Sequence, residues 1–115
     1  MLVPFAPDIW TDTRHARFFG IECGSRMTVV RLRQGGLFVH SPVALDAETR
    51  QQVDALGEVR AIVAPSLFHH LHVRGWMDAY PKAHVAACPG LDWKRSDLPW
   101  SSVLGDVPHP IWAGE

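Results

Sequence analysis

The sequence predicts an α/β domain in which helices pack on a mixed sheet. A hairpin pattern occupies residues 27–40, and short apolar runs at 59–64 and 84–87 are typical of strands buried on both faces. Helical segments separate these runs, so the predicted order is strand, strand, helix, strand, helix, strand. A hairpin followed by βαβ crossovers gives a layered α/β domain with both antiparallel and parallel pairs.

The predicted hairpin begins with the strand 27–33, MTVVRLR, which is rich in β-branched residues. The turn Gln34-Gly35-Gly36 contains two residues that tolerate positive φ, and LFVH at 37–40 is the return strand. A helix is expected from Asp46 to Leu56. The Asp46 carboxylate is a good N-cap, and Gly57 stands where a C′ glycine belongs.

Two buried strands and a second helix complete the predicted sheet. The run VRAIVA at 59–64 is closed by Pro65, and a helix is expected over 70–80, ended by Pro81. The third buried strand is 84–87. A short helical turn, LDWKR, follows Pro89-Gly90.

The segment 89–115 differs from the rest of the chain. It holds four of the nine prolines and three of the five tryptophans, and no helix or strand of normal length is predicted there. A compact domain rarely ends with a long, aromatic, structureless segment. We therefore expect this segment to lie against a partner, either a missing C-terminal half of a larger domain or a second copy in a homo-oligomer.

Length and composition restrict the class of protein. The 115 residues suffice for one domain, so 1–115 is predicted to be a single domain. Eleven basic and twelve acidic residues leave a net charge of −1, which disfavours nucleic acid and anionic membranes as partners. The N-terminus lacks the pattern of a signal peptide, and no segment approaches the roughly 18 apolar residues of a membrane span. We expect a cytoplasmic protein.

The candidate functional site is the histidine cluster, residues 65–72, PSLFHHLH. It follows a buried strand, at the sheet edge where α/β proteins usually carry their sites. His69, His70 and His72 offer nitrogen ligands that suit zinc or iron. His40 is a separate candidate because it ends a strand at the same edge. For each of these histidines the alternative is an ordinary structural role, such as a helix cap, a bond to a backbone carbonyl or a solvated side chain.

The runs MTVVRLRQGGLFVHSPVALD and VRAIVAPSLFHHLHVRGWMDAYPKAHVAACPGL resemble the N-terminal half of the metallo-β-lactamase-like fold. More narrowly, they resemble an uncharacterised bacterial family of that superfamily, a domain of unknown function, as do VPFAPDIW and PHPIWAGE near the two ends. The resemblance implies one half of a four-layer αββα sandwich made of two similar halves. It also implies metal ligands from loops at one edge of the sheets.

The superfamily's hallmark is an H-x-H-x-D-H segment after a buried strand. Placed after 59–64, it puts Pro65 and Leu67 at the first two histidine positions. His69 then stands at the aspartate position and His70 at the final histidine, so only His70 matches in residue type.

A second placement of the hallmark takes His70 and His72 as its first two histidines. Arg74 and Gly75 then stand where aspartate and histidine are needed. Both placements imply a degraded metal site. The remaining ligands of the superfamily come from its second half, which lies beyond Glu115.

Two functions stay open at this point. The first is a divergent metallo-hydrolase for an unknown small molecule, with zinc or iron held by His70 together with His69 or His72 and hydrolysis of an ester, amide or thioester as the reaction class. The second is a non-catalytic domain that has lost its metal and binds a ligand or a protein. A third reading, a redox or metal module using Cys88, has no support from spacing. The isolated chain is expected to be inactive.

Overall fold

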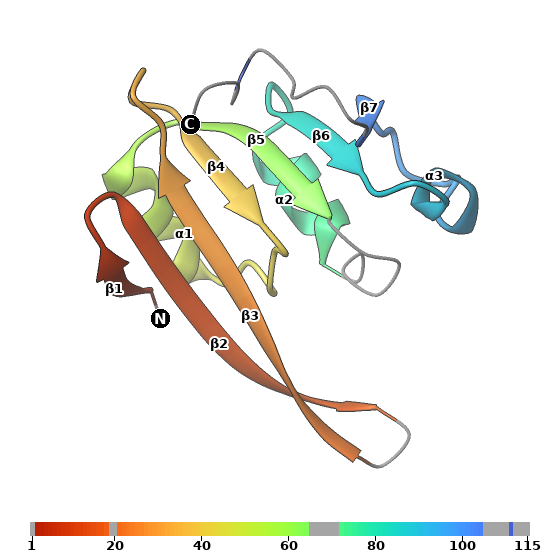
Figure 1. The fold of residues 1–115 in the computed structure, drawn as a ribbon, viewed down its shortest axis with the longest axis horizontal. Coiled ribbons are helices and arrows are strands. Elements are labelled where there is room, and N and C mark those ends of the chain that lie inside the picture. The colour runs from red at the N-terminus through yellow and green to blue at the C-terminus, as the bar shows by residue number, and fades with distance from the viewer. Residues whose placement is uncertain (1, 19–20, 65–71, 105–110, 112–115) are drawn as a thin grey trace.

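The computed structural model describes residues 2–18, 21–64, 72–104 and 111, which form one seven-stranded sheet with helices α1 and α2 behind it (Figure 1). Along the chain the elements are β1 (Val3–Ala6), β2 (Ile9–Phe18), β3 (Ile21–Arg31), β4 (Leu37–His40), α1 (Ala47–Leu56), β5 (Val59–Ala64), α2 (Val73–Ala79), β6 (His84–Ala87), α3 (Leu91–Lys94) and β7 (Ser102–Val103). The predicted α/β class with a mixed sheet is confirmed.

The strands lie in the sheet in the same order as in the chain, from β1 to β7. The pairs from β1 to β4 are antiparallel, and the pairs from β4 to β7 are parallel. Helix α1 connects β4 to β5, and α2 connects β5 to β6, so both predicted βαβ crossovers are present. The parallel strands therefore end together at one edge of the sheet, which we call the carboxyl edge.

The N-terminal strands are where the sequence prediction was wrong. The structure places β1 and β2 before the predicted hairpin, and β3 begins at Ile21 and ends at Arg31 instead of spanning 27–33. The pattern IWTDTRHARF has little apolar alternation, but all ten residues of β2 pair with β3. Pairing with a strong neighbouring strand therefore overrides weak local propensity.

Helix α1 forms as its end signals predict. The Asp46 carboxylate accepts a hydrogen bond from the Thr49 N–H at 2.8 Å, which satisfies an amide of the first turn. At the other end, the Gly57 N–H bonds to the Val53 carbonyl. Val53 is fully buried, and Leu45 and Leu56 pack against the core beside it.

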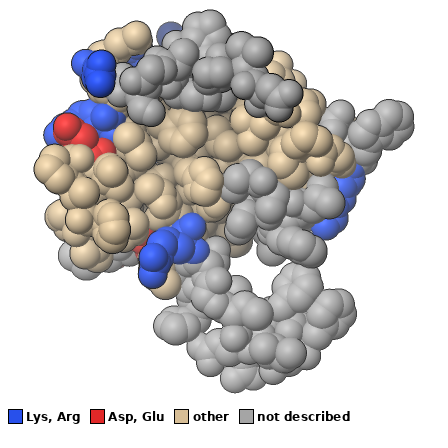
Figure 2. Space-filling view, viewed as in Figure 1, with Lys and Arg blue, Asp and Glu red and all other residues tan. Residues whose placement is uncertain are grey.

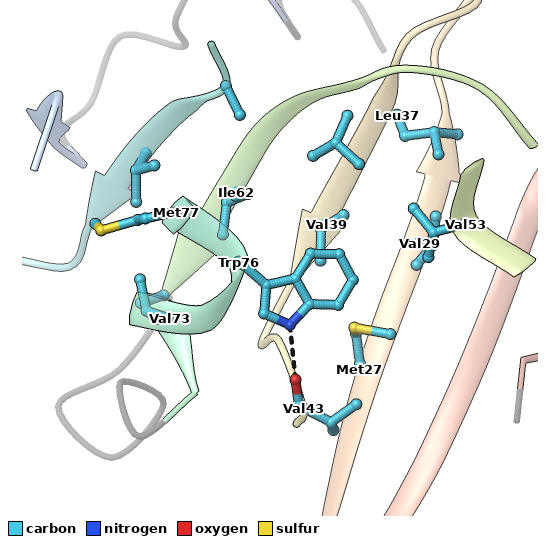
Figure 3. Packing of buried hydrophobic residues seen from close by; sticks show 14 of the residues in the cluster. Met27, Val29, Leu37, Val39, Val43, Val53, Ile62, Val73, Trp76 and Met77 are labelled. Carbon is cyan, nitrogen blue, oxygen red and sulfur yellow. Dashed lines mark hydrogen bonds between the residues drawn. The ribbon is translucent and has the colours of Figure 1, made fainter. Parts of the chain in front are cut away.

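The core lies between the sheet and the two longer helices, and Trp76 of α2 is at its centre (Figure 3). This side chain is fully buried, and its indole Nε1–H donates to the Val43 carbonyl at 2.7 Å. The bond satisfies the indole donor and fixes the buried loop that follows β4. Helix α2 spans Val73–Ala79 with His72 as its N-cap and Tyr80 as its C-cap, so it is shorter than the predicted 70–80, of which residues 70 and 71 lie outside the described residues.

The described part of the proline- and tryptophan-rich segment packs on this chain's own core. Leu91 of α3 and Leu98 are buried in the core, and Trp100 and Leu104 contact it. The two-residue strand β7 pairs with β6, an element that the sequence did not predict. The position of Trp100 is therefore explained within the chain, while the Trp93 side chain and Trp112 lie outside what the structure describes.

The two faces of the sheet differ in what covers them. The buried apolar helix side chains all join the core on one face; they are Val53, Val73, Trp76, Met77 and Leu91. The register places the opposite set of strand residues on the other face, which α1 and α2 do not cover and which we call the open face; Ala61, Val63 and Ala86 of this set are nonetheless buried. In Figure 2 this face is turned to the viewer, and the charged side chains among the described residues lie around its margin.

Candidate functional site

The carboxyl edge brings together the ends of three parallel strands. The last residues of β4, β5 and β6 are His40, Ala64 and Ala87 (Figure 1). The register sets His40 beside Val63, and Cys88 continues the ladder by donating its N–H to the Ala64 carbonyl at 2.9 Å. Such an edge is the usual position of sites in α/β sheets.

His40 is a half-buried side chain on the open face, at the end of β4. Its Nδ1 lies 3.2 Å from the Ser41 hydroxyl oxygen, within hydrogen-bond distance. The imidazole is thus oriented by a neighbour, which is how proteins hold a histidine that serves as a ligand or proton carrier. The structure supports the predicted position of this candidate at the carboxyl edge.

Ser41 turns the chain away from the sheet at this point. Its φ of 57° lies in the left-handed region, which is uncommon for a residue with a Cβ. The Ser41 N–H donates to the Val63 carbonyl at 2.9 Å, and the residue is buried. These contacts hold an unfavourable backbone conformation in place. The sequence analysis did not predict this turn, and a serine before proline carries no signal for it.

Of the histidine cluster, the structure describes only His72. This residue is exposed, stands at the N-cap of α2 and makes no side-chain hydrogen bond to the helix end. His69 and His70 lie outside the described residues. The structure therefore places His40 at the carboxyl edge and His72 at the start of α2, and the role of all four histidines stays a prediction.

The resemblance to the metallo-β-lactamase-like fold implies a metal ion, which needs a sufficient set of donor side chains. Structural and catalytic zinc sites take at least three protein ligands. Among residues 2–18, 21–64, 72–104 and 111, no group of three or more His, Cys, Asp or Glu side chains is placed to hold a metal. The described residues alone therefore do not fit a metal centre, and any such centre depends on His69 and His70.

Cys88 does not take part in a redox or metal site within the described residues. Its thiol is free and buried, directly after β6. Buried thiols in apolar surroundings are chemically inert. Cys88 belongs to the apolar core cluster, which accounts for its position by packing.

The hairpin β2–β3 extends past the carboxyl edge. The last β3 residue that pairs with β4 is Thr28, opposite His40, while the β2–β3 ladder continues to Phe18 opposite Ile21. Figure 1 shows this two-stranded arm projecting beyond the ends of β4 and β5. The sequence analysis missed the arm because it placed the start of the strand at residue 27.

Tyr80, at the C-terminal end of α2 and away from the carboxyl edge, has a strongly raised pKa. Burial, and then a hydrogen bond from the Tyr80 hydroxyl to the Asp54 carboxylate at 2.8 Å, raise the pKa of Tyr80 well above its ordinary value of 10.0. Arg50 of the same helix as Asp54 lies over the Tyr80 ring, 5.9 Å from its centroid. This group links α1 to α2 and has a structural role.

The fold is that of a metallo-β-lactamase, of which this chain matches one half. The chain is similar to DIM-1 metallo-beta-lactamase (17% identity, TM-score 0.68), with 90% of this chain covering 51% of that one. It is similar to a metallo-beta-lactamase from Hirschia baltica (12% identity, TM-score 0.67), with 91% of this chain covering 52% of that one. It is also similar to the metallo-beta-lactamase FIM-1 from Pseudomonas aeruginosa in its mono-zinc form (10% identity, TM-score 0.65), with 91% of this chain covering 50% of that one. At such low identities the likeness concerns the fold alone.

Residues 7–102 match the family described as Domain of unknown function (DUF4336), and the chain belongs to that family. The search of curated proteins gave no match. The chain spans about half the length of the metallo-beta-lactamase structures that it resembles. In the described part of the chain, no helix has the length and hydropathy needed to cross a bilayer.

Proposed function

We propose that this chain is a metallo-β-lactamase-like domain with a divergent metallo-hydrolase site at its carboxyl edge. The observation that supports the proposal is the position of His40, at the end of β4 and beside Val63 of β5. The histidine cluster begins directly after Ala64, the last residue of β5. A cluster that follows β5 in sequence is, on this proposal, at the same edge as His40.

His70 is the centre of the proposed ligand set, because it alone matches the superfamily's hallmark in residue type. His69 or His72 supplies a second imidazole, and His40 is a further candidate from the neighbouring strand. Imidazole nitrogen is a good ligand for zinc and for iron. A histidine in place of the hallmark aspartate leaves the cluster without a carboxylate, which is why we describe the site as divergent.

When bound, zinc or iron supplies a water of lowered pKa, the nucleophile for hydrolysis of an ester, amide or thioester in a small molecule. A catalytic site keeps three protein ligands and one open position. The described residues supply His40 and His72 only, so we expect little or no hydrolase activity from the 115-residue chain by itself.

A non-catalytic domain that binds a ligand or a protein is the second candidate function. The loss of the first two hallmark histidines, replaced by Pro65 and Leu67, favours it. In this alternative the carboxyl edge keeps its shape without a metal.

Metal content separates the two candidates. The chain is purified without chelators, incubated with zinc or with ferrous iron, dialysed and analysed for bound metal. A divergent metallo-hydrolase site predicts about one metal ion per chain, lost in His70→Ala and weakened in His40→Ala.

The matched control is His84→Ala, which removes an imidazole at the start of β6, at the opposite edge of the sheet. This variant should keep its metal. A folded wild-type chain without stoichiometric zinc or iron would contradict the metallo-hydrolase proposal and favour the non-catalytic domain.

A further inference from the structure

The turn after β4 places a hydroxyl group against the imidazole of His40. The Ser41 Oγ lies 3.2 Å from His40 Nδ1, and this nitrogen is the hydrogen-bond partner of the hydroxyl among the described residues. Ser41 keeps only 3% of its surface exposed, so its hydroxyl is largely withdrawn from water. The direction of the hydrogen bond therefore follows from what a buried hydroxyl needs.

A serine hydroxyl has one proton to donate and two lone pairs that accept. A buried donor without an acceptor loses its hydration without compensation, whereas an unused lone pair costs less. In the described part of the chain, no buried side-chain nitrogen or oxygen lacks a hydrogen-bond partner. The Ser41 O–H therefore donates to His40 Nδ1, which is then the unprotonated nitrogen of the neutral imidazole.

The backbone fixes Ser41 beside β5. Its φ of 57° lies in the left-handed region, and its N–H donates to the Val63 carbonyl at 2.9 Å. A serine held in an uncommon conformation at a buried position keeps its side chain where the surrounding contacts place it. The hydroxyl is therefore fixed relative to the sheet, and through Nδ1 it holds the ring of His40 there.

We infer that Ser41 is a positioning residue that holds neutral His40 as the tautomer protonated on Nε2. His40 then presents an N–H at the carboxyl edge, and the group that it meets is an acceptor, such as a carboxylate or carbonyl oxygen of the chain or of a bound molecule. This tautomer places His40 beside the ligand set and not within it, so weaker metal binding in His40→Ala would reflect the loss of a neighbouring donor. The meaning for a bound molecule rests on the proposed function, whereas the tautomer does not.

Nitrogen-15 NMR of the metal-free protein measures the tautomer, because protonated and unprotonated ring nitrogens have well-separated chemical shifts. The chain is labelled on its histidines and kept with a chelator at about pH 9, where histidine is neutral. The His40 signals are identified by their loss in His40→Gln. The wild type should be protonated on Nε2 in roughly tenfold excess or more. Ser41→Gly removes the hydroxyl and tolerates the positive φ, and the excess should fall at least about threefold.

The matched control is Ser102→Ala, which removes a hydroxyl that lies 2.7 Å from Nε2 of another histidine, His84. It should leave the tautomer ratio of His40 unchanged. Protonation of His40 mainly on Nδ1, equal ratios in the wild type and Ser41→Gly, or an equal change in Ser102→Ala would each overturn the inference. If thermal unfolding shows that Ser41→Gly does not fold, the wild-type ratio alone decides. Because the measurement is made without metal, its outcome is separate from the metal content that decides the proposed function.

Discussion

Trp76 shows how a single residue joins three parts of the fold. It stands on α2, packs among the strand side chains of the core and donates a hydrogen bond to the loop that follows β4. Its complete burial makes it a core residue. A buried tryptophan with a satisfied N–H contributes packing and loop geometry together.

Trp76→Phe is predicted to lower the free energy of unfolding by about 2–4 kcal/mol, because it leaves a cavity and an unpaired Val43 carbonyl. Urea unfolding measures the change. Trp10→Phe is the matched control, since Trp10 is only half-buried and lies against the Arg31 guanidinium at 5.1 Å. An equal loss in both variants would show that the buried hydrogen bond of Trp76 contributes little.

Asp46→Ala is predicted to destabilise the protein by about 1 kcal/mol, because the Thr49 N–H loses its acceptor at the start of α1. The exposed neighbour Glu48 lies in the same first turn, so Glu48→Ala controls for the loss of negative charge near the helix N-terminus. Thermal unfolding of both variants checks the prediction. A smaller effect for Asp46→Ala than for Glu48→Ala would mean that charge, not capping, matters here.

At the scale of elements, Tyr80 and Asp54 link the two helices that cover the sheet. The raised pKa of Tyr80 keeps its hydroxyl protonated in the folded state above pH 10, where the tyrosine of the unfolded chain ionises. The folded state therefore binds a proton that the unfolded state releases. This contribution to stability is complete below about pH 10 and is lost as the pH rises above it.

Tyr80→Phe should accordingly reduce the fall of unfolding free energy with rising pH above about pH 10. Tyr80 is the one tyrosine in the sequence, so tyrosinate absorbance reports on it directly. In the wild type we expect this absorbance to rise together with unfolding. Asp54→Asn is the companion variant and should bring the titration to lower pH. A wild-type titration at the ordinary tyrosine pKa, in folded protein, would contradict the prediction.

Two glycines form a matched pair for testing element ends against element interiors. A Cβ at Gly57, after α1, would lie 2.8 Å from the Gly35 carbonyl oxygen, whereas a Cβ at Gly75 within α2 meets no heavy atom within 4 Å. Gly57→Ala should therefore destabilise by about 1–3 kcal/mol, and Gly75→Ala should stabilise by about 0.5–1 kcal/mol. Chemical denaturation measures both, and changes of the same sign would refute the prediction.

The elements that the sequence predicts well are those with strong local signals. The bounds of β4, β5 and β6 agree with prediction because each is an apolar run closed by a serine, proline or cysteine-proline boundary. The capped helix α1 agrees for the same reason. Strands β1, β2 and β7 were missed because pairing, not composition, makes them strands.

The candidate site itself stays a prediction, and the structure bears only on where His40 and His72 lie. Histidines after β4 and β5 indicate the carboxyl edge, because parallel strands end together. The orientation of His40 depends on the left-handed conformation of Ser41, which is held by a hydrogen bond from the Ser41 N–H to the Val63 carbonyl. These are tertiary features, and the sequence His40-Ser41-Pro42 contains no pattern that predicts them. His69 and His70 lie outside the described residues and stay predictions.

At the scale of the whole molecule, the chain is one helix-covered sheet with the fold of half a metallo-β-lactamase. One face of the sheet is covered by α1 and α2. The resemblance of the sequence to the metallo-β-lactamase-like fold predicted this half-fold. The proline- and tryptophan-rich segment 89–115 led to the prediction of a partner. The described part of that tail packs on the chain's own core, and the partner stays a prediction.

The strand order of this sheet has a consequence for biosynthesis. Each strand has as its neighbours in space the strands that precede and follow it in sequence. As the polypeptide leaves the ribosome, at about 5–20 residues per second, every new strand finds its pairing edge already made and adds to the end of a growing sheet. No strand has to be inserted between two that are already joined, so the domain is suited to vectorial, co-translational assembly.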